Sequence, residues 1–461
     1  MSLTRAMDFL RPRAHSVASI SGPAGGLHTP STLPPPCTHA APLLPCTLLA
    51  FTRLALTLLA LTLIAAPLHA QETPPPPSDQ PTVSAVFLPP RFPRAASSDV
   101  IAVTPAAITA LLDLQEDELG KRGTPDANQW PYEGVYRTRG SLPVGYRIGG
   151  TCIVILALTS TPGYEQDNRR VAAVERAITY ICSAREHADM STQAYDGGYD
   201  VRIWGNIEAL HCLAHLERKR LIPQHLKLTA KAALEDYLDA VVTLEMPATG
   251  GWNYARPAGK ATVGAPASFV TACALQALLE ARAAGYTVDS ALIDRGVAVL
   301  EKSRGATGTI VYSGPASERT RISDSVPGAT GRMTLTESTL MLVGKGSIER
   351  VRAALDAFIT HWDWLDQRRA KTGTHVPPYM VAPYYFMFAH RYAAQAIEHL
   401  PKADREEYRA RINGLLMSVK GPDTTWNDRV FPRSAGYGTA MALLAIHQPA
   451  QRSERAEEQR K

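Results

Sequence analysis

The sequence predicts an all-α fold in which about five to six helical hairpins form a ring, with apolar helices inside and amphipathic helices outside. A short phrase of small and apolar residues recurs at Gly150–Leu158, Gly205–Leu216, Ala267–Glu280 and Gly436–Ile446. The first three phrases are each followed by a segment with charge on one face. A repeated unit predicts stacked copies of one element. A helix that is apolar all round must be buried on every side. Strand-like alternation is confined to a possible minor hairpin at Thr309–Tyr312.

Composition and charge bound the class of protein. The 461-residue chain is 45% hydrophobic and 20% charged, which is typical of a soluble globular protein. Its formal net charge is +5, and the first 70 residues carry three of these charges, so the remainder is near +2. This balance, with no basic block along a helix, argues against a nucleic-acid partner.

The first 70 residues are predicted to be a leader with an export signal. Arg53 precedes the apolar run Leu54–Leu68, and small Ala70 is the expected cleavage point. The run is shorter than the ~20 residues of a comfortable membrane span, although an uncleaved N-terminal anchor is the alternative. Residues 71–99 are Pro-rich and predict a disordered linker to an exported, periplasmic or secreted domain.

The ring domain is predicted to span residues 100–449, followed by a charged tail at 450–461. Apolar residues at helical spacing indicate a first helix at Pro105–Gly120, and Thr124–Gly149 is rich in turn residues. The inner and outer segments then alternate. They are Thr151–Leu158 with Arg169–Ala188, Ile203–Arg220 with Leu226–Leu244, Ser268–Ala284 with Ser290–Ser303, Leu335–Gly344 with Ile348–Arg369, Tyr379–Leu400 with Asp404–Val419, and finally Gly436–Ile446.

Two tryptophan-bearing loops, Gly250–Tyr254 and Trp426–Arg429, precede inner segments and are interpreted as structural braces between repeats. The four cysteines after Ala70 all lie inside apolar helical phrases, so free buried thiols are expected, with disulfides as the alternative. They are Cys152, Cys182, Cys212 and Cys273.

The phrases Gly250–Trp252, Thr271–Leu275 and Gly438–Leu444 resemble the prenyltransferase and squalene-oxidase repeats of the terpenoid cyclase-like α/α-toroid superfamily. The resemblance covers roughly Gly149–Pro449, and it is nearest to exported bacterial toroid proteins. It implies an α/α toroid. The superfamily's Asp-x-Asp-Asp acid does not occur in this chain, and Val270 stands where its zinc-binding His would fall. No cofactor and no metal are therefore expected.

The loop before the second inner segment offers weak catalytic candidates. Asp196, Tyr199, Asp200 and Arg202 could serve acid–base work or sugar recognition. The alternative is that the carboxylates only cap the helix start.

Aromatic residues offer ligand-binding candidates. Tyr385, Phe388 and Tyr392 are spaced three and four apart and share one helix face; Trp204 lies near the start of another inner segment. They could line an apolar pocket, or they could simply pack against the neighbouring helix. His211 and His215 share a face, but no third ligand accompanies them, so they are not taken as a metal site.

Three functions remain open at this stage. The first is an exported binding or scaffold protein with a central cavity, whose partner is an apolar ligand, a glycan or a protein. The second is an enzyme that acts on a polyprenyl or triterpene-like lipid, and the third is a polysaccharide lyase or hydrolase. A deep aromatic cavity favours a lipid, an open polar groove favours a glycan, and a filled centre favours the scaffold.

Overall fold

The computed structural model describes residues 94–193, 201–246, 248–253, 265–319, 321–369, 373–375, 377–428 and 431–448. All of them belong to one unit of the chain, Ala85–Lys461.

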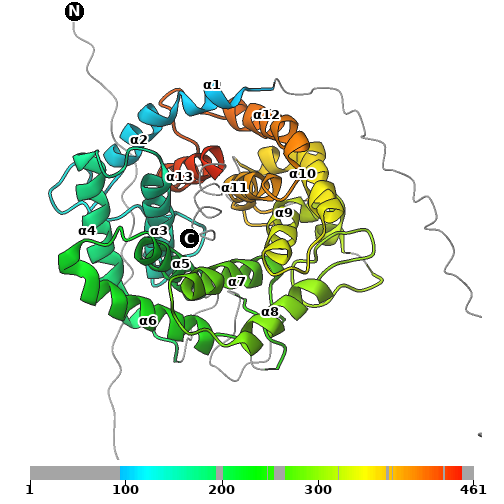
Figure 1. Cartoon of the computed structure of the whole chain (residues 1–461), viewed down its shortest axis with the longest axis horizontal. Coiled ribbons are helices and arrows are strands. Elements are labelled where there is room, and N and C mark those ends of the chain that lie inside the picture. Colours follow the sequence, from blue (N-terminus) through cyan, green and yellow to red (C-terminus); the bar gives the residue numbers. More distant parts are fainter. Residues whose placement is uncertain are drawn as a thin grey trace, which may run out of the picture. The chain divides into compact units, whose positions relative to one another are not determined.

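Six helices of the described chain form an inner ring (Figure 1). Each packs against the next, and the last packs against the first, so the ring is closed. They are α3 (Val144–Ser160), α5 (Arg202–Arg218), α7 (Ser268–Ala283), α9 (Val326–Leu342), α11 (Tyr385–Ile397) and α13 (Ser434–Ile446). This arrangement confirms the predicted α/α toroid.

An outer ring surrounds them, and each outer helix packs mainly on one inner helix, while α10 contacts both α9 and α11 (Figure 1). The outer helices are α2 (Thr104–Asp113), α4 (Asn168–Ala184), α6 (Lys227–Thr243), α8 (Ser290–Lys302), α10 (Ile348–Arg369) and α12 (Lys402–Ser418), with short α1 (Ser97–Ile101) against α12. Five hairpins join consecutive helices. The sixth pairs α13 with α2, from the opposite end of the unit.

Local sequence explains the two kinds of helix. In α4, residues Ala173, Val174, Ala177 and Ile181 recur at helical spacing and are buried, while the opposite face is charged. Asp167 caps this helix by accepting hydrogen bonds from the backbone N–H groups of the two arginines at its start. In contrast, α7 and α13 are buried along nearly their whole length.

Four predicted boundaries were wrong by six residues or more. The helix expected at Pro105–Gly120 is α2, which ends at Asp113, and the inner segment expected at Thr151–Leu158 is α3, which begins at Val144 within the stretch expected to be turns. The helix expected at Leu335–Gly344 is α9, which begins at Val326. Its first half is rich in Thr and Gly and lacks the apolar signal; the hydroxyl of Thr330 donates to the carbonyl of Val326, so burial leaves that group satisfied. The helix expected at Tyr379–Leu400 is α11, which begins only at Tyr385 because Pro383 and the prolines before it restrict the backbone.

The described residues contain no β-strand. The possible hairpin at Thr309–Tyr312 does not form; an isolated bridge pairs Ile310 with Arg304. Ala267 makes a second isolated bridge with Ser313 nearby.

Three buried tryptophans connect neighbouring hairpins in the same way. Each backbone N–H donates to a threonine hydroxyl on the next inner helix, and each indole N–H donates to a carbonyl near the end of the preceding outer helix. The three connections are Trp130 with Thr151 and Leu111, Trp252 with Thr271 and Val241, and Trp426 with Thr439 and Leu416. We call these the tryptophan braces. They confirm the structural role predicted for Trp252 and Trp426.

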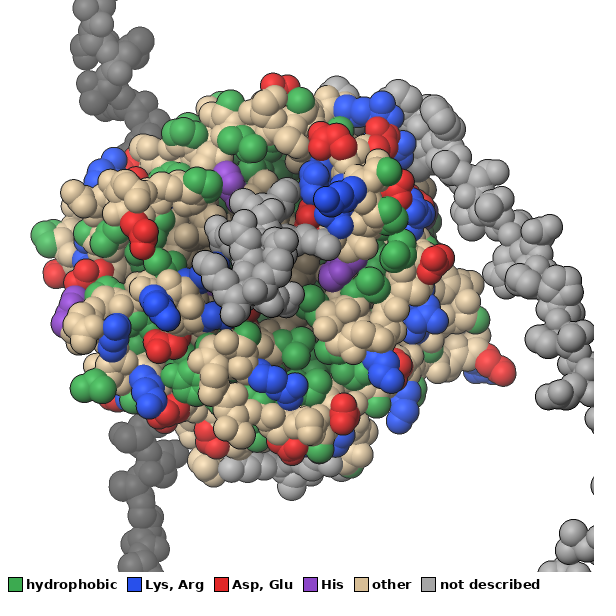
Figure 2. All heavy atoms as spheres, in the orientation of Figure 1, with side chains coloured by type: hydrophobic (Ala, Val, Ile, Leu, Met, Phe, Trp, Pro, Cys, Tyr) green, Lys and Arg blue, Asp and Glu red, His purple; other side chains and the backbone are tan. Residues whose placement is uncertain are grey.

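Acidic and basic side chains are interspersed over the face of the ring in Figure 2, and no single sign of charge dominates that face. Within the described residues, no helix combines the length and apolar character that crossing a bilayer requires.

Candidate functional site

An aromatic cavity lies where the inner helices begin. The first turns of α3, α5, α7, α11 and α13 all contribute side chains to it, because the inner helices run parallel. Its volume is about 70 Å³. The lining residues are Tyr132, Val135, Tyr136, Tyr146, Val201, Trp204, Phe269, Val270, Thr374, Tyr384, Phe388 and Tyr437.

The rings of this cavity pack edge to face or tilted. Tyr132 contacts Tyr437 with ring centroids 4.6 Å apart, and Tyr146 lies 5.8 Å from Trp204. Elsewhere in the lining, the ring centroid of Phe269 lies 5.8 Å from that of Tyr384. Such geometries are the favoured ones for aromatic pairs, so the wall is preformed.

A glycine makes room for the tryptophan of this wall. A Cβ atom added at Gly149 would lie 2.4 Å from the Trp204 ring, which is closer than any real contact. The indole therefore packs directly on the backbone of α3. We expect any larger residue at this position to push Trp204 into the cavity.

The predicted ligand-binding residues divide between the cavity and the layer behind it. Trp204 and Phe388 line the cavity. Tyr385 and Tyr392 do not; they are 2% and 3% exposed and are packed inside the ring. Tyr385 lies against Tyr384, with centroids 4.5 Å apart, and Tyr392 lies behind Phe388 at 4.6 Å.

Of the predicted catalytic candidates, Asp196, Tyr199 and Asp200 lie outside the described residues. Arg202 is described and buried, and its guanidinium donates to the carbonyl of Ser191. This contact ties the start of α5 to the segment after η1 (Ala188–Met190).

One helical turn deeper, the inner helices present a polar layer. Trp204, Phe269, Phe388 and Tyr437 of the cavity wall are followed four residues later by Glu208, Cys273, Tyr392 and Met441. Residues four apart share a helix face, so the second set lies behind the first. The thiol of Cys273 lies 3.6 Å from the Tyr392 hydroxyl.

Glu208 is the most unusual residue of the polar layer. It is 2% exposed, and its Oε2 has no hydrogen-bond partner in the described chain. Burial raises the pKa of Glu208 to about 7, although the positive charge of Arg391 opposes this rise. A carboxyl group with such a pKa carries a proton for part of the time near neutral pH.

Arg391 is the buried cation of the same region. Its Cζ lies 5.2 Å from the centroid of the Tyr392 ring, and its Nη1 lies 3.9 Å from the sulfur of Met441. The Tyr392 ring thus stabilises the guanidinium by a cation–π contact. Sequence reasoning selected neither Glu208 nor Arg391 as a site residue, because one glutamate and one arginine on separate helices form no motif.

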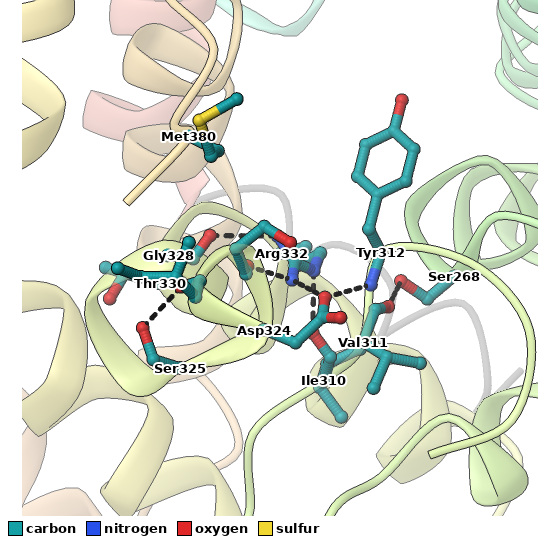
Figure 3. Close-up of polar contacts among 12 residues, drawn as sticks. Ser268, Ile310, Val311, Tyr312, Asp324, Ser325, Gly328, Thr330, Arg332 and Met380 are labelled. Carbon is teal, nitrogen blue, oxygen red and sulfur yellow. Dashed lines mark hydrogen bonds and ion pairs between the residues drawn. The ribbon is translucent and has the colours of Figure 1, made fainter. Parts of the chain in front are cut away.

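A second polar network holds the loop beside the cavity (Figure 3). Buried Arg332 of α9 donates to the carboxylate of Asp324 at 2.8 Å and to the carbonyl of Ile310 at 2.6 Å. The carboxylate also accepts from the backbone N–H of Tyr312 at 2.7 Å. The Tyr312 ring stays in contact with this network, because the Cζ of Arg332 lies 5.9 Å from its centroid. The same ring meets Phe269 and His375, with ring centroids 5.7 Å and 5.6 Å away.

His375 belongs to the loop before α11. Its Nδ1 lies 2.8 Å from the carbonyl oxygen of Met380. Burial lowers the pKa of His375, the hydrogen bond to Met380 opposes this shift, and the charges of Arg332 and Arg368 add to it. The imidazole is therefore held neutral beside the aromatic wall.

No group of His, Cys, Asp and Glu side chains in the described ranges is arranged to hold a metal ion. His215 lies 3.4 Å from the Glu280 carboxylate. The four cysteines of the domain are buried and unbridged. Burial raises the pKa of Cys273 to about 12, so its thiol stays protonated and inert.

No protein-family model and no curated protein matches this chain. Solved structures similar to it include a type II terpene cyclase from Scytonema in complex with geranylgeranyl dihydroxybenzoate, at 13% identity and a TM-score of 0.46, covering 77% of this chain and 98% of that one. An α-1,6-mannanase of Salegentibacter is 11% identical, with a TM-score of 0.47 and coverage of 77% and 99%. A cellobiose 2-epimerase from Spirochaeta thermophila is 13% identical, with a TM-score of 0.48 and coverage of 76% and 96%.

Proposed function

We propose that this protein is a binding protein whose aromatic cavity holds the apolar end group of a larger ligand. The observation that carries the proposal is a preformed wall of aromatic rings at one end of a filled ring of helices. Aromatic rings offer apolar surface and π-faces without strong hydrogen-bonding demands. They suit a hydrocarbon or isoprenoid-like group.

The size of the cavity decides how much of the ligand it takes. Its volume of about 70 Å³ is well below the ~300–1,000 Å³ of a site that encloses a drug-sized molecule. The interior behind it is filled by Tyr385, Tyr392 and Arg391. Only a short branch can therefore enter, and the rest of the ligand lies outside. A filled centre favours binding over chemistry inside the ring.

One observation favours an enzyme as the second candidate. Glu208 lies one turn behind Trp204, and burial brings its pKa to about 7. A protonated carboxyl behind an aromatic wall has the chemistry to protonate an alkene of a polyprenyl or triterpene-like lipid. Glu208 does not line the cavity, however, so this function requires Tyr437 or Trp204 to move.

The two candidates are separated by one set of experiments on the purified chain. Native mass spectrometry after organic extraction identifies any co-purified lipid, and titration with geranylgeraniol is followed by tryptophan fluorescence. We expect saturable quenching that Trp204→Ala abolishes, whereas Trp364→Ala on outer helix α10 leaves it unchanged. Absence of saturable binding contradicts the proposal. Conversion of geranylgeraniol to a product that Glu208→Gln abolishes establishes the enzyme instead.

We also propose that the chain is exported, on the strength of the apolar run Leu54–Leu68 after Arg53. This run lies outside the described residues. N-terminal sequencing of the protein from a membrane-enclosed compartment should find Gln71 as the first residue. Recovery of an intact leader in the membrane fraction would instead indicate an anchor.

A further inference from the structure

A second hollow, the α3–α4 cleft, adjoins the aromatic cavity. Tyr146 and Arg147 are neighbours in the first turn of α3; the first lines the aromatic cavity and the second lines the cleft. The cleft has a volume of about 490 Å³, which is within the range of small-molecule sites. Its remaining walls come from the turn at 138–142, the end of α4 and the segment around η1.

The rim of the cleft is a tight turn in a demanding conformation. Thr138 and Ser141 exchange backbone hydrogen bonds at 2.9 Å, and the residues between them both have positive φ. Arg139, at φ 50°, occupies a left-handed conformation that side chains other than glycine rarely adopt. Its guanidinium pairs with Asp189 at 2.5 Å across the rim. The turn is thus held in place by an ion pair, which preforms one wall.

Two polar groups face the cleft without a protein partner. Within the described residues, the guanidinium of Arg147 makes no hydrogen bond and no ion pair. Tyr180 is 7% exposed, and its hydroxyl likewise makes no hydrogen bond. Burial raises the pKa of Tyr180, so this hydroxyl keeps its proton and remains a donor. Two donors turned toward a hollow of this size are available to the acceptors of a ligand.

The charges of the cleft balance. Arg139 and Arg147 are matched by Asp189 and the exposed Glu118, with His187 as a further polar group near Asp189. Such a site has no net attraction for an anion or a cation. Leu142, Val144, Ala184 and the ring of Tyr180 supply apolar surface among the polar groups. A ligand that fits this lining has donors and acceptors all round and apolar C–H faces.

We infer that the α3–α4 cleft binds an uncharged sugar of one or two rings. Arg147 and Tyr180 donate to its hydroxyl oxygens, Asp189 and Glu118 accept from its hydroxyl groups, and Leu142 and Val144 contact its C–H face. The site is distinct from the aromatic cavity, and it stands whether or not that cavity binds an apolar group.

Saturation-transfer NMR with the full chain tests this inference. The probes are glucose and cellobiose, with glucuronate and glucosamine as charged comparators, each at millimolar concentration. We expect the neutral sugars to receive saturation and the charged ones to bind no more tightly. Absence of transfer to both neutral sugars overturns the inference, and a clear preference for a charged sugar overturns the assigned ligand class.

Single-residue variants test whether the sugar binds in the α3–α4 cleft. Arg147→Ala should weaken sugar affinity about tenfold, and Tyr180→Phe, which removes only a hydroxyl group, about threefold. Arg350→Ala, on the exposed surface of outer helix α10, is the matched control and should change nothing. Far-ultraviolet circular dichroism establishes that each variant is folded. Folded Arg147→Ala and Tyr180→Phe proteins that bind as tightly as the parent would overturn the site.

Discussion

Trp252 and Trp204 lie near the starts of neighbouring inner helices but have different roles. Trp252 is 0% exposed, and its indole N–H donates to the Val241 carbonyl at 2.7 Å. Trp204 is partly buried, lines the aromatic cavity, and makes no indole hydrogen bond within the described residues. The brace gives both N–H groups of Trp252 a hydrogen-bond acceptor. In the cavity wall, the indole N–H of Trp204 has no acceptor among the described residues and is available to a ligand. A toroid can therefore separate the tryptophans that hold it together from those that can meet a ligand.

The largest expected effect comes from removing a brace. Trp252→Ala leaves a large cavity and an unpaired buried carbonyl at Val241, so we expect the free energy of unfolding to fall by about 3–5 kcal/mol. Urea unfolding followed by circular dichroism measures it. Trp252→Phe keeps most of the ring and loses the N–H, so its smaller loss reports the hydrogen bond. An unchanged midpoint for Trp252→Ala would remove the distinction between the two tryptophans.

The second effect concerns the polar layer behind the cavity wall. The pKa of Glu208 is about 7 in the folded chain, against 4.5 as its ordinary value. The folded state therefore binds more protons between these values, and its stability falls as pH rises through this window. The shift corresponds to about 3 kcal/mol between pH 4 and pH 8.

Comparison of Glu208→Gln with the parent isolates this contribution. Burial lowers the pKa of His390 to about 4, so His390 favours the folded state as pH rises and opposes Glu208 in the parent. The difference between the two proteins cancels His390. We expect the variant to gain stability relative to the parent from pH 4 to pH 8, as measured by urea unfolding at each pH. Parallel pH profiles would show that Glu208 is not buried as described.

The third effect uses two glycines of α13. A Cβ atom at Gly438 would lie 2.2 Å from the carbonyl oxygen of Trp426, so Gly438→Ala forces the brace apart and should cost about 1–3 kcal/mol. At Gly436 the nearest atom, in the Trp130 ring, would be 3.6 Å away. Gly436→Ala should therefore stabilise the chain by about 0.5–1 kcal/mol through helix propensity. Thermal unfolding of both variants checks the opposite signs; equal effects would contradict the close approach at the brace.

The smallest expected loss of stability is at the cavity wall. Trp204→Ala removes a ring that already faces a hollow, so we expect a loss of only about 1 kcal/mol, within the ordinary range for single substitutions. The same variant should abolish quenching by geranylgeraniol. A stability loss as large as that of Trp252→Ala would make Trp204 another brace.

The sequence was sufficient to predict the fold because the two kinds of helix differ in composition. Apolar phrases such as Ala267–Glu280 become inner helices, and segments with one charged face become outer helices. The signal failed at α9, where Thr and Gly replace the large apolar residues. The hydroxyl groups of Thr330 and Thr339 bond to carbonyls of their own helix, which lets these polar residues be buried, and this cannot be read from hydropathy.

The candidate site was only partly accessible to sequence reasoning. Phe388 and Trp204 were selected for their ring type and line the cavity, but Tyr385 and Tyr392 share the same pattern and lie behind it. Helical spacing shows which residues share a face of one helix. It does not show how deep a residue lies within the ring of six inner helices. Glu208 and Arg391 come from separate helices, and only the closed ring brings them near each other.

The pairing of α2 with α13 bears on how the chain is made. The helix α2 is made early, but its partner α13 is complete only at Ile446, 333 residues after Asp113. At roughly 5–20 residues per second, this interval lasts about 15–60 s. During synthesis the nascent chain is an open arc with uncovered apolar edges, and the ring can close only after α13 has been made.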